Sequence, residues 1–403
     1  MAPELFSFLQ PIRYLVMTVH ALGSLSPQQF LNEYWQKKPL VIRQAFSGFK
    51  DFLSPEELAG LALEEDVEAR LIQQEDDQWQ VQCGPLEEED FLTLPESHWT
   101  LLVQTLEHWL PEVKELQQAF SFLPDWRHDD VMVSYATQGG GVGPHIDQYD
   151  VFLIQGQGKR HWRVGEPKAS IQEIRPHPDL KQIADFDAII DVVLEPGDLL
   201  YIPPQTAHDG IAIDASMTYS IGFRAPDHNA LLSQLLLNLM DSEENHQSRY
   251  SDKDRQFTPT SAQLDQDIVT WCRQALTSMT DTQLLTAFGQ LVTRPKYEQE
   301  PQASITGEEL RYQLQTSEFS LVKNGDSTFT YFYEQEQTSD AFLILMADGE
   351  NHKFQGQYGV LIENISNNNI LPSKELENSF QDIDFLNEIA SLINRGCIII
   401  KQD

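Results

Sequence analysis

The feature that most constrains this 403-residue chain is a glycine-rich stretch, Gly139 to Asp150, that contains the His-x-Asp pair His145 and Asp147. Successive side chains of a β-strand point to opposite faces, so His145 and Asp147 would point the same way on a strand. We expect that strand to run from His145 to Ile154. Two imidazoles and one carboxylate on one side of a metal ion form the facial triad of non-haem Fe(II) sites. The stretch therefore predicts two of three ligands.

The third ligand is expected at His208, at the end of a run that begins at Glu195. Glu195-Pro-Gly is a turn signal, Leu199 to Ile202 has the composition of a buried strand, and Pro203-Pro204 ends that strand just before His208. A His-x-Asp pair alone is common by chance, as two polar residues on a surface strand. The His-x-Asp pair and the run from Glu195 to His208 together favour a metal site.

A basic residue, Arg160, lies fifteen residues after His145, behind a glycine-rich segment. The glycines predict a hairpin turn that returns the chain beside the strand of His145. A guanidinium there can bind a carboxylate through two parallel N–H bonds. In the strand expected at Val131–Tyr135, either Ser134 or Tyr135 should face the interior.

From Asp129 onward the hydrophobic period becomes two, and we expect roughly eight strands, with a flexible glycine lip at residues 139–141. Antiparallel strands of this number around an interior site favour a double-stranded β-helix, the jelly-roll architecture shared with cupins. Upstream, Trp99 to Leu110 is expected to be helical. The expected strands include Val131–Tyr135, His145–Ile154, Trp162–Val164, Ile189–Leu194, Leu199–Ile202 and Met217–Phe223.

These motifs resemble the JmjC-type 2-oxoglutarate oxygenases, and more narrowly the bacterial ribosomal oxygenases that hydroxylate an arginine of large-subunit ribosomal protein sixteen. The resemblance runs from about residue 20 to the C-terminus and is strongest between residues 123 and 226. The chain departs from the family at its N-terminus, where it has some sixteen residues more than the family pattern, so Met17 is an alternative start. The matching stretches are Trp35–Ile42, Leu123–Arg127, Gly139–Phe152, Gln155–Gly165, Glu195–Pro204 and Tyr219–Pro226.

The resemblance implies Fe(II) bound by His145, Asp147 and His208, with 2-oxoglutarate and O2 as co-substrates. It implies that Arg160 binds the distal carboxylate of 2-oxoglutarate and that Ser134 helps to hold this co-substrate. The implied reaction is hydroxylation of an arginine side-chain carbon in a basic ribosomal protein. The implied location is the cytoplasm.

The resemblance also implies an α+β organisation in four parts. Residues 1–19 are an N-terminal extension, and residues 20–228 are the JmjC oxygenase domain, with its core barrel at about 123–226. Residues 229–303 are a helical dimerisation segment, and residues 304–403 are a winged-helix-like domain. Leucines at helical spacing in residues 230–240 need a partner surface. That surface belongs either to a second copy in a homodimer or to the chain's own barrel.

The charge balance is strongly acidic, with 27 Lys and Arg against 62 Asp and Glu and a net charge of −35. Such a field repels nucleic acid and anionic membranes and attracts a basic partner. Plain solubility, or a salt- or cold-adapted host, explains the charge equally well. Residues 304–403 are poor in Lys and Arg, so we expect protein contacts there rather than DNA binding. The chain has no apolar run long enough to span a membrane.

Two other classes of function remain open from the residues alone. One is a cupin-type metal enzyme that acts on a small molecule without 2-oxoglutarate, against which Arg160 argues. The other is a non-catalytic binding protein built on a metal-free barrel, against which the intact His-x-Asp pair and His208 argue. Lysine demethylation is a lesser variant, because nothing in the chain resembles a methyl-lysine cage.

Overall fold

The computed structural model describes residues 21–402, apart from residues 76–77, 169–171, 175–176, 242–265, 297–303 and 335–340. The predicted N-terminal extension, residues 1–19, lies outside the described residues, as does part of the predicted helical segment. The chain divides into two compact units, Met1–Leu123 with His128–Phe223 and Pro124–Arg127 with Arg224–Asp403. None of the described helices is both long and apolar enough to cross a bilayer.

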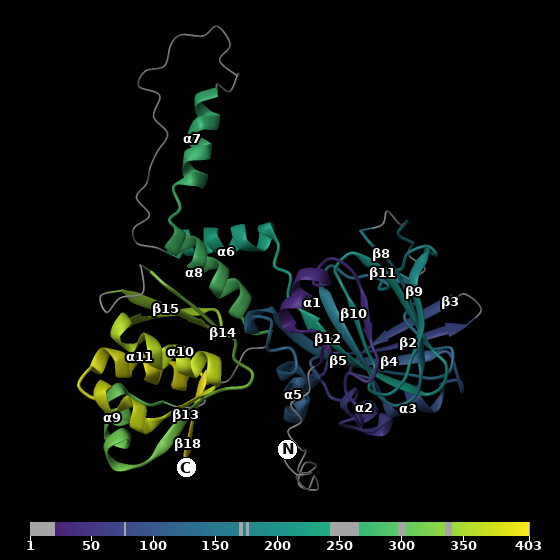
Figure 1. Cartoon of the computed structure of the whole chain (residues 1–403), viewed down its shortest axis with the longest axis horizontal. Coiled ribbons are helices and arrows are strands. Elements are labelled where there is room, and N and C mark those ends of the chain that lie inside the picture. Colours follow the sequence, from purple (N-terminus) through teal and green to yellow (C-terminus); the bar gives the residue numbers. More distant parts are fainter. Residues whose placement is uncertain are drawn as a thin grey trace. The chain divides into compact units, whose positions relative to one another are not determined.

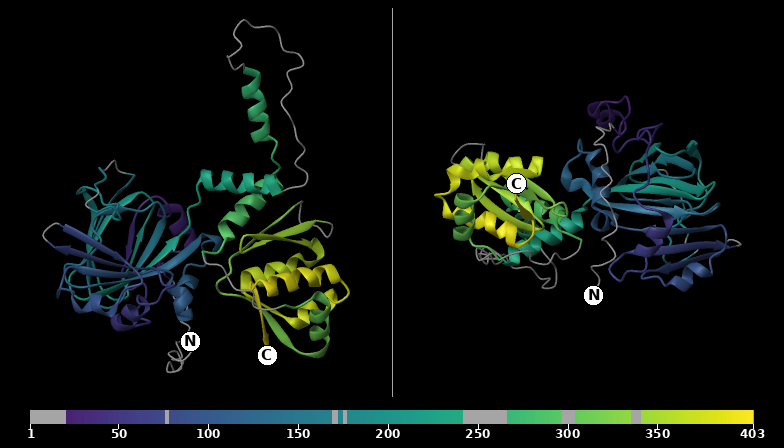
Figure 2. Two further views of the ribbon diagram at one scale, coloured as in Figure 1. Left: turned by 180° about the vertical axis from the view of Figure 1, so that it is seen from behind. Right: turned by 90° about the horizontal axis from the view of Figure 1, so that it is seen from below.

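Two antiparallel sheets form the first unit, and their strands curve into a barrel (Figure 1; Figure 2, left). In the described residues the larger sheet has the order β1-β10-β7-β12-β5-β4-β2-β3 and the smaller sheet the order β6-β11-β8-β9. From β6 onward the chain passes repeatedly between the two sheets, so the predicted jelly-roll fold is confirmed. The strands are β1 Leu40–Ile42, β2 Ala69–Glu75, β3 Gln78–Cys83, β4 Trp99–Val103, β5 His128–Ala136, β6 His145–Ile146, β7 Asp150–Gln155, β8 Arg160–Pro167, β9 Ala188–Leu194, β10 Leu199–Ile202, β11 Thr206–Ala212 and β12 Ser216–Phe223.

Short helices cover the outer face of the larger sheet. Helix α1 begins with a capping box, in which the Ser26 hydroxyl accepts from Gln29 N and the Gln29 side chain accepts from Ser26 N. This start places Phe30 on the inward face, where its ring centroid lies 5.6 Å from that of Phe152 and 5.0 Å from that of Tyr201. Apolar packing therefore fills this side of the sheet, and its other face lines the barrel. The helices are α1 Pro27–Glu33, α2 Pro55–Leu61, α3 Glu88–Leu92, α4 Leu106–Trp109 and α5 Lys114–Gln118.

The predicted hairpin before Arg160 is wrong. Strand β7 pairs with β10 and β12 in the larger sheet, whereas β8 pairs with β11 and β9 in the smaller one. The continuous strand predicted from His145 to Ile154 also divides into β6 and β7, which belong to different sheets. In a jelly roll the chain crosses to the opposite sheet instead of folding back beside itself. Alternating hydrophobicity identifies a strand but not its partner.

Two other local predictions also fail. Residues 99–103 form strand β4 between β5 and β2, and only Leu106–Trp109 is helical. The glycine lip is not free, because Gly139 N donates to Ala212 O at 2.8 Å and Ala212 N donates to Gly140 O at 2.9 Å. A Cβ on Gly140 would lie 2.3 Å from Trp99 O. Glycine is needed here for close backbone approach rather than for flexibility.

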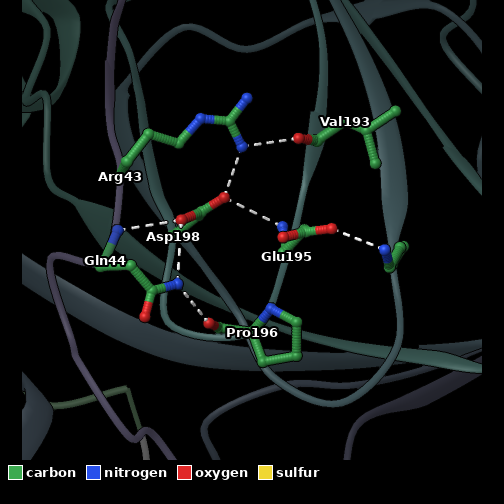
Figure 3. A network of polar contacts seen from close by, with 7 residues as sticks. Arg43, Gln44, Val193, Glu195, Pro196 and Asp198 are labelled. Atoms are coloured by element: carbon green, nitrogen blue, oxygen red, sulfur yellow. Dashed lines mark hydrogen bonds and ion pairs between the residues drawn. The ribbon is translucent and has the colours of Figure 1, made fainter.

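The turn Glu195-Pro-Gly-Asp is held by the buried carboxylate of Asp198 (Figure 3). Asp198 accepts from Gln44 N at 2.9 Å, Glu195 N at 3.0 Å and Arg43 Nη1 at 2.5 Å. Burial by itself would raise the pKa of Asp198, but these hydrogen bonds hold the pKa below its usual value. The carboxylate thus joins the end of β1 to the turn that leads into β10 and then to His208.

The second unit contains two small sheets, of order β17-β13-β18 and β14-β15-β16 in the described residues, with helices packed around them. Its core includes Leu321, Leu345 and Leu386. The winged-helix-like description of residues 304–403 stays a prediction. The elements are α6 His228–Asp241, α7 Gln266–Thr277, α8 Asp281–Thr293, α9 Gly307–Thr316, α10 Gly359–Asn368, α11 Ile383–Asn394, β13 Phe319–Lys323, β14 Phe329–Tyr333, β15 Phe342–Ala347, β16 Glu350–Gln355, β17 Ile370–Pro372 and β18 Ile398–Gln402.

Candidate metal and co-substrate site

The three predicted metal ligands come together inside the barrel. Strands β6 and β11 pair antiparallel with His145 opposite His208, and the two ring centroids are 4.1 Å apart. Asp147 follows directly after β6, and its Oδ2 lies 3.8 Å from His145 Nε2 and 3.6 Å from His208 Nε2. The predicted strand Leu199–Ile202 is confirmed as β10, and His208 is the third residue of the following strand, β11. Strand pairing, rather than a loop, aligns the two histidines.

Both imidazoles are oriented in the same way. His145 Nδ1 lies 2.9 Å from Gly143 O, and His208 Nδ1 lies 3.0 Å from Thr206 O. A carbonyl oxygen can only accept a hydrogen bond, so Nδ1 carries the proton in each ring. The unprotonated Nε2 of each ring is then left to face Asp147. Metal-binding histidines typically donate a hydrogen bond from the other ring nitrogen to a carbonyl oxygen in this way.

The geometry and chemistry of these donors fit one divalent transition-metal ion. One ligand atom from each residue lies within 4.8 Å of the others. Two donors that each lie about 2.1 Å from one ion are themselves about 3 to 4 Å apart, which matches the distances to Asp147 Oδ2. Burial, followed by the neighbouring His145, lowers the pKa of His208, so its imidazole is neutral near pH 7. Two imidazoles and one carboxylate on one side suit Fe(II) and leave the opposite side open.

Trp162 packs beside His208 on the neighbouring strand. The two ring centroids are 6.2 Å apart, and the indole covers Gly210, where a Cβ would lie 2.6 Å from the ring. Gly210 is therefore required for the indole to lie flat on β11. Trp162 provides an apolar wall next to the most deeply buried ligand.

Arg160, at the start of β8, is a buried cation. It is 5% exposed, and no carboxylate among the described residues pairs with it. Burial lowers the pKa of Arg160 to about 10. Arg160, Trp162 and Val164 alternate along β8 and share a face, and Val164 pairs with His208. The Arg160 side chain therefore leaves β8 on the same interior face as the ligands, and its backbone lies about 13 Å along the strand from Val164, the residue opposite His208.

Two hydroxyls hold the guanidinium. Arg160 Nη1 donates to Ser134 Oγ at 3.0 Å, which places the predicted Ser134 in the interior, and Nη2 lies 3.5 Å from Ser216 Oγ. Ser216 was missed by sequence reasoning. It begins the pattern Ser216-x-Thr218-x-Ser220, in which polar residues recur with a period of two within the fully buried β12. That pattern could have identified a polar interior face.

Lys159 and Tyr149 complete the surroundings. Lys159 is exposed and its Nζ lies 2.5 Å from Glu195 Oε1, so it points away from Arg160. Partial burial, followed by the carboxylates of Asp147, Asp130 and Asp129, raises the pKa of the phenol of Tyr149, a residue that is 40% exposed. The phenol therefore stays protonated and sits in a negative field close to the metal ligands.

Comparisons with known proteins give a consistent result. Residues 115–231 match the family model described as the JmjC domain. Ribosomal protein uL16 3-hydroxylase from Escherichia coli (strain K12) is 52% identical over 210 residues, which cover 52% of this chain and 56% of that protein. The aligned region thus spans about half the length of this curated relative.

Solved structures match over nearly the whole chain. The X-ray structure of E. coli YcfD has a TM-score of 0.81 and 37% sequence identity, covering 94% of this chain and 99% of that chain. The structure of YcfD, a ribosomal oxygenase from E. coli, in complex with cobalt and 2-oxoglutarate has a TM-score of 0.77 and 36% identity, with 94% and 98% coverage. That structure of the relative contains both cobalt and 2-oxoglutarate.

Proposed function

The chain belongs to the family of JmjC-domain ribosomal oxygenases, and from this membership we propose that it is an Fe(II)- and 2-oxoglutarate-dependent hydroxylase. The proposed substrate is an arginine side chain of a large-subunit ribosomal protein. The E. coli relative is itself named as a hydroxylase of a ribosomal protein, uL16. One observation carries the proposal. A three-donor metal site and a buried guanidinium that pairs with no carboxylate among the described residues line the same barrel interior.

Each residue has a defined role in this proposal. His145, Asp147 and His208 bind Fe(II) on one side and leave positions open for 2-oxoglutarate and O2. When bound, Fe(II) and 2-oxoglutarate supply the oxidising chemistry, in which O2 is consumed as 2-oxoglutarate loses CO2 and becomes succinate. Arg160 binds the distal carboxylate and acquires the counter-ion that it otherwise lacks. Ser134 and Ser216 fix the plane of the guanidinium.

A cationic substrate side chain is supported by the electrostatics near the ligands. Tyr149 lies in the field of Asp129, Asp130 and Asp147, and the chain as a whole carries a net charge of −35. A negative site attracts a basic protein and stabilises a guanidinium that enters it. A ribosomal-protein substrate also implies that the protein works in the cytoplasm.

The experiment that tests this function measures succinate and product together. With Fe(II), 2-oxoglutarate and a peptide from the basic ribosomal protein, we expect succinate formation and the gain of one oxygen atom on an arginine, detected by mass spectrometry. The matched control is the same peptide with that arginine replaced by lysine, which should gain no oxygen because Lys presents a point charge rather than a planar fork.

Outcomes of this experiment separate the candidate functions. Oxidation of a small molecule without any need for 2-oxoglutarate would favour the cupin-type alternative and reject the proposal. Succinate formation that is never accompanied by a modified arginine would keep the oxygenase class and reject the substrate.

A homodimer is part of the proposal, and the helical segment is its interface. Helices α6 and α8 pack on each other, yet they leave apolar side chains in solvent, including Leu236 at 59% and Met240 at 76% exposure. Exposed leucines on adjoining helices are typical of a protein–protein contact.

We expect the wild type to sediment as a dimer and Leu236→Glu as a monomer. Leu92→Glu, which changes a still more exposed leucine in the first unit, should remain dimeric. A monomeric wild type would contradict this assignment.

A further inference from the structure

The ligand His145 lies on the shortest strand of the smaller sheet. Strand β6 has only two residues, so its pairing with β11 provides little support by itself. On its other side β6 is bordered by the long connection between β8 and β9, residues 168–187, which we call the excursion. There His145 forms an isolated bridge with Gln182, and Ile183 N donates to Pro144 O at 2.9 Å. The excursion therefore continues the backbone pairing at this edge of the sheet through an isolated bridge.

Within the excursion, residues 172–174 and 180–184 pair with each other. Ile174 N donates to Gln182 O and Ala184 N donates to Gln172 O, each at 2.8 Å. Glu173 and Ile183 form a bridge between the same two segments. The segment that borders β6 is thus itself part of a hydrogen-bonded pair, which can hold Gln182 in a fixed position.

The side chain of Gln182 reaches the backbone that orients His145. Gln182 is 3% exposed, and its Nε2 donates to Val142 O at 2.7 Å. The next residue, Gly143, has a φ of +76°, and a Cβ there would lie 2.2 Å from Gln182 Nε2. The carbonyl of Gly143 in turn accepts from His145 Nδ1 at 2.9 Å. The Gln182 amide therefore holds the Val142–Gly143 peptide, and the adjoining carbonyl of Gly143 holds the His145 imidazole.

We propose that Gln182 is a positioning residue for the metal ligand His145, acting through the Val142–Gly143 backbone. The inference rests on the proposed function, in that it assumes that His145 binds a metal. His208 does not depend on this support, because β11 is paired on both sides, with β6 and β8. Asp147 is held separately, since its backbone carbonyl accepts from Gln205 N at 2.7 Å.

Cobalt binding to the full-length, metal-free protein tests the proposal without any turnover. Gln182→Met keeps the side-chain length and removes the donor, and Gln182→Glu keeps the shape and turns an acceptor toward Val142 O. We expect both variants to bind Co(II) about 10- to 100-fold more weakly, the usual cost of losing a partner that orients a ligand. The visible absorption spectrum of bound Co(II) should also change, because the angle of one imidazole is no longer fixed.

The matched control is Lys181→Ala, which alters the neighbouring exposed residue of the same segment and should leave Co(II) affinity unchanged. Thermal unfolding of each metal-free variant is measured alongside. Wild-type affinity and spectrum in Gln182→Met would overturn the proposal. So would failure of both variants to fold, which would make Gln182 a purely structural residue. Failure of the proposed function is distinguishable, because the wild type would then bind Co(II) yet form no succinate.

Discussion

Alanine at His145, Asp147 or His208 should abolish 2-oxoglutarate turnover and reduce metal affinity by more than about 100-fold. The reason is that each change leaves two donors from a set of three that the strands bring within 4.8 Å of one another. Loss of a partner that only orients a ligand costs about 10- to 100-fold, so loss of the ligand itself must cost more. The measurement is bound iron or cobalt per chain, followed by succinate formation at saturating 2-oxoglutarate.

His161→Ala is the matched control for the three ligand variants. His161 lies on β8 of the same sheet, but it belongs to the exposed ion pair with Asp191, whose Oδ1 is 2.6 Å from His161 Nε2. We expect this variant to retain metal and turnover. Wild-type metal content in any of the three ligand variants would remove that residue from the site.

Replacement of Arg160 should have opposite effects on co-substrate binding and on the stability of the free protein. Arg160→Ala removes the charge-assisted hydrogen bonds to the distal carboxylate, so 2-oxoglutarate should bind more weakly by about 2–4 kcal/mol, or roughly 30- to 1,000-fold. Metal binding should persist, because the three ligands are unchanged. Arg160→Lys should recover part of the affinity, since an ammonium keeps the charge but not the planar fork.

The stability effect follows from the burial of an unpaired cation. Burial lowers the pKa of Arg160 to about 10, which means that the charged form is disfavoured in the folded protein relative to water. Below that pH the charge therefore destabilises the ligand-free fold, and Arg160→Met should raise its melting temperature. Added 2-oxoglutarate should raise the melting temperature of the metal-loaded wild type and have little effect on Arg160→Met.

Lys159→Ala is the control for the Arg160 variants, because the Lys159 side chain is exposed and contacts Glu195. This variant should bind 2-oxoglutarate normally. Impaired 2-oxoglutarate binding in Lys159→Ala, with normal binding in Arg160→Ala, would show that Lys159 rather than Arg160 binds the co-substrate. Normal binding in both variants would reject the 2-oxoglutarate assignment.

The donor types of the site and the general architecture could be predicted from local sequence patterns. His145, Asp147, His208 and Arg160 could be selected because their chemistry and the strand-like segments around them are local properties. The start of α1 depends on equally local contacts, since its capping box joins Ser26 and Gln29, which are three positions apart. Alternating hydrophobicity marked the strands of the barrel, and with them the jelly roll.

The pairing of the strands and the contacts between distant polar groups depend on the assembled fold. Residues 99–103 are a strand because β5 and β2 border them, and β7 and β8 lie in different sheets although the chain joins them directly. Hydrogen bonds from Arg160 to Ser216 and from Gln182 to Val142 O join residues that are 56 and 40 positions apart. Local periodicity shows which face of a segment is buried, but not what it is buried against. The hydrogen bonds that hold the site residues in place therefore could not be predicted from local patterns, because they join segments that meet only in the folded protein.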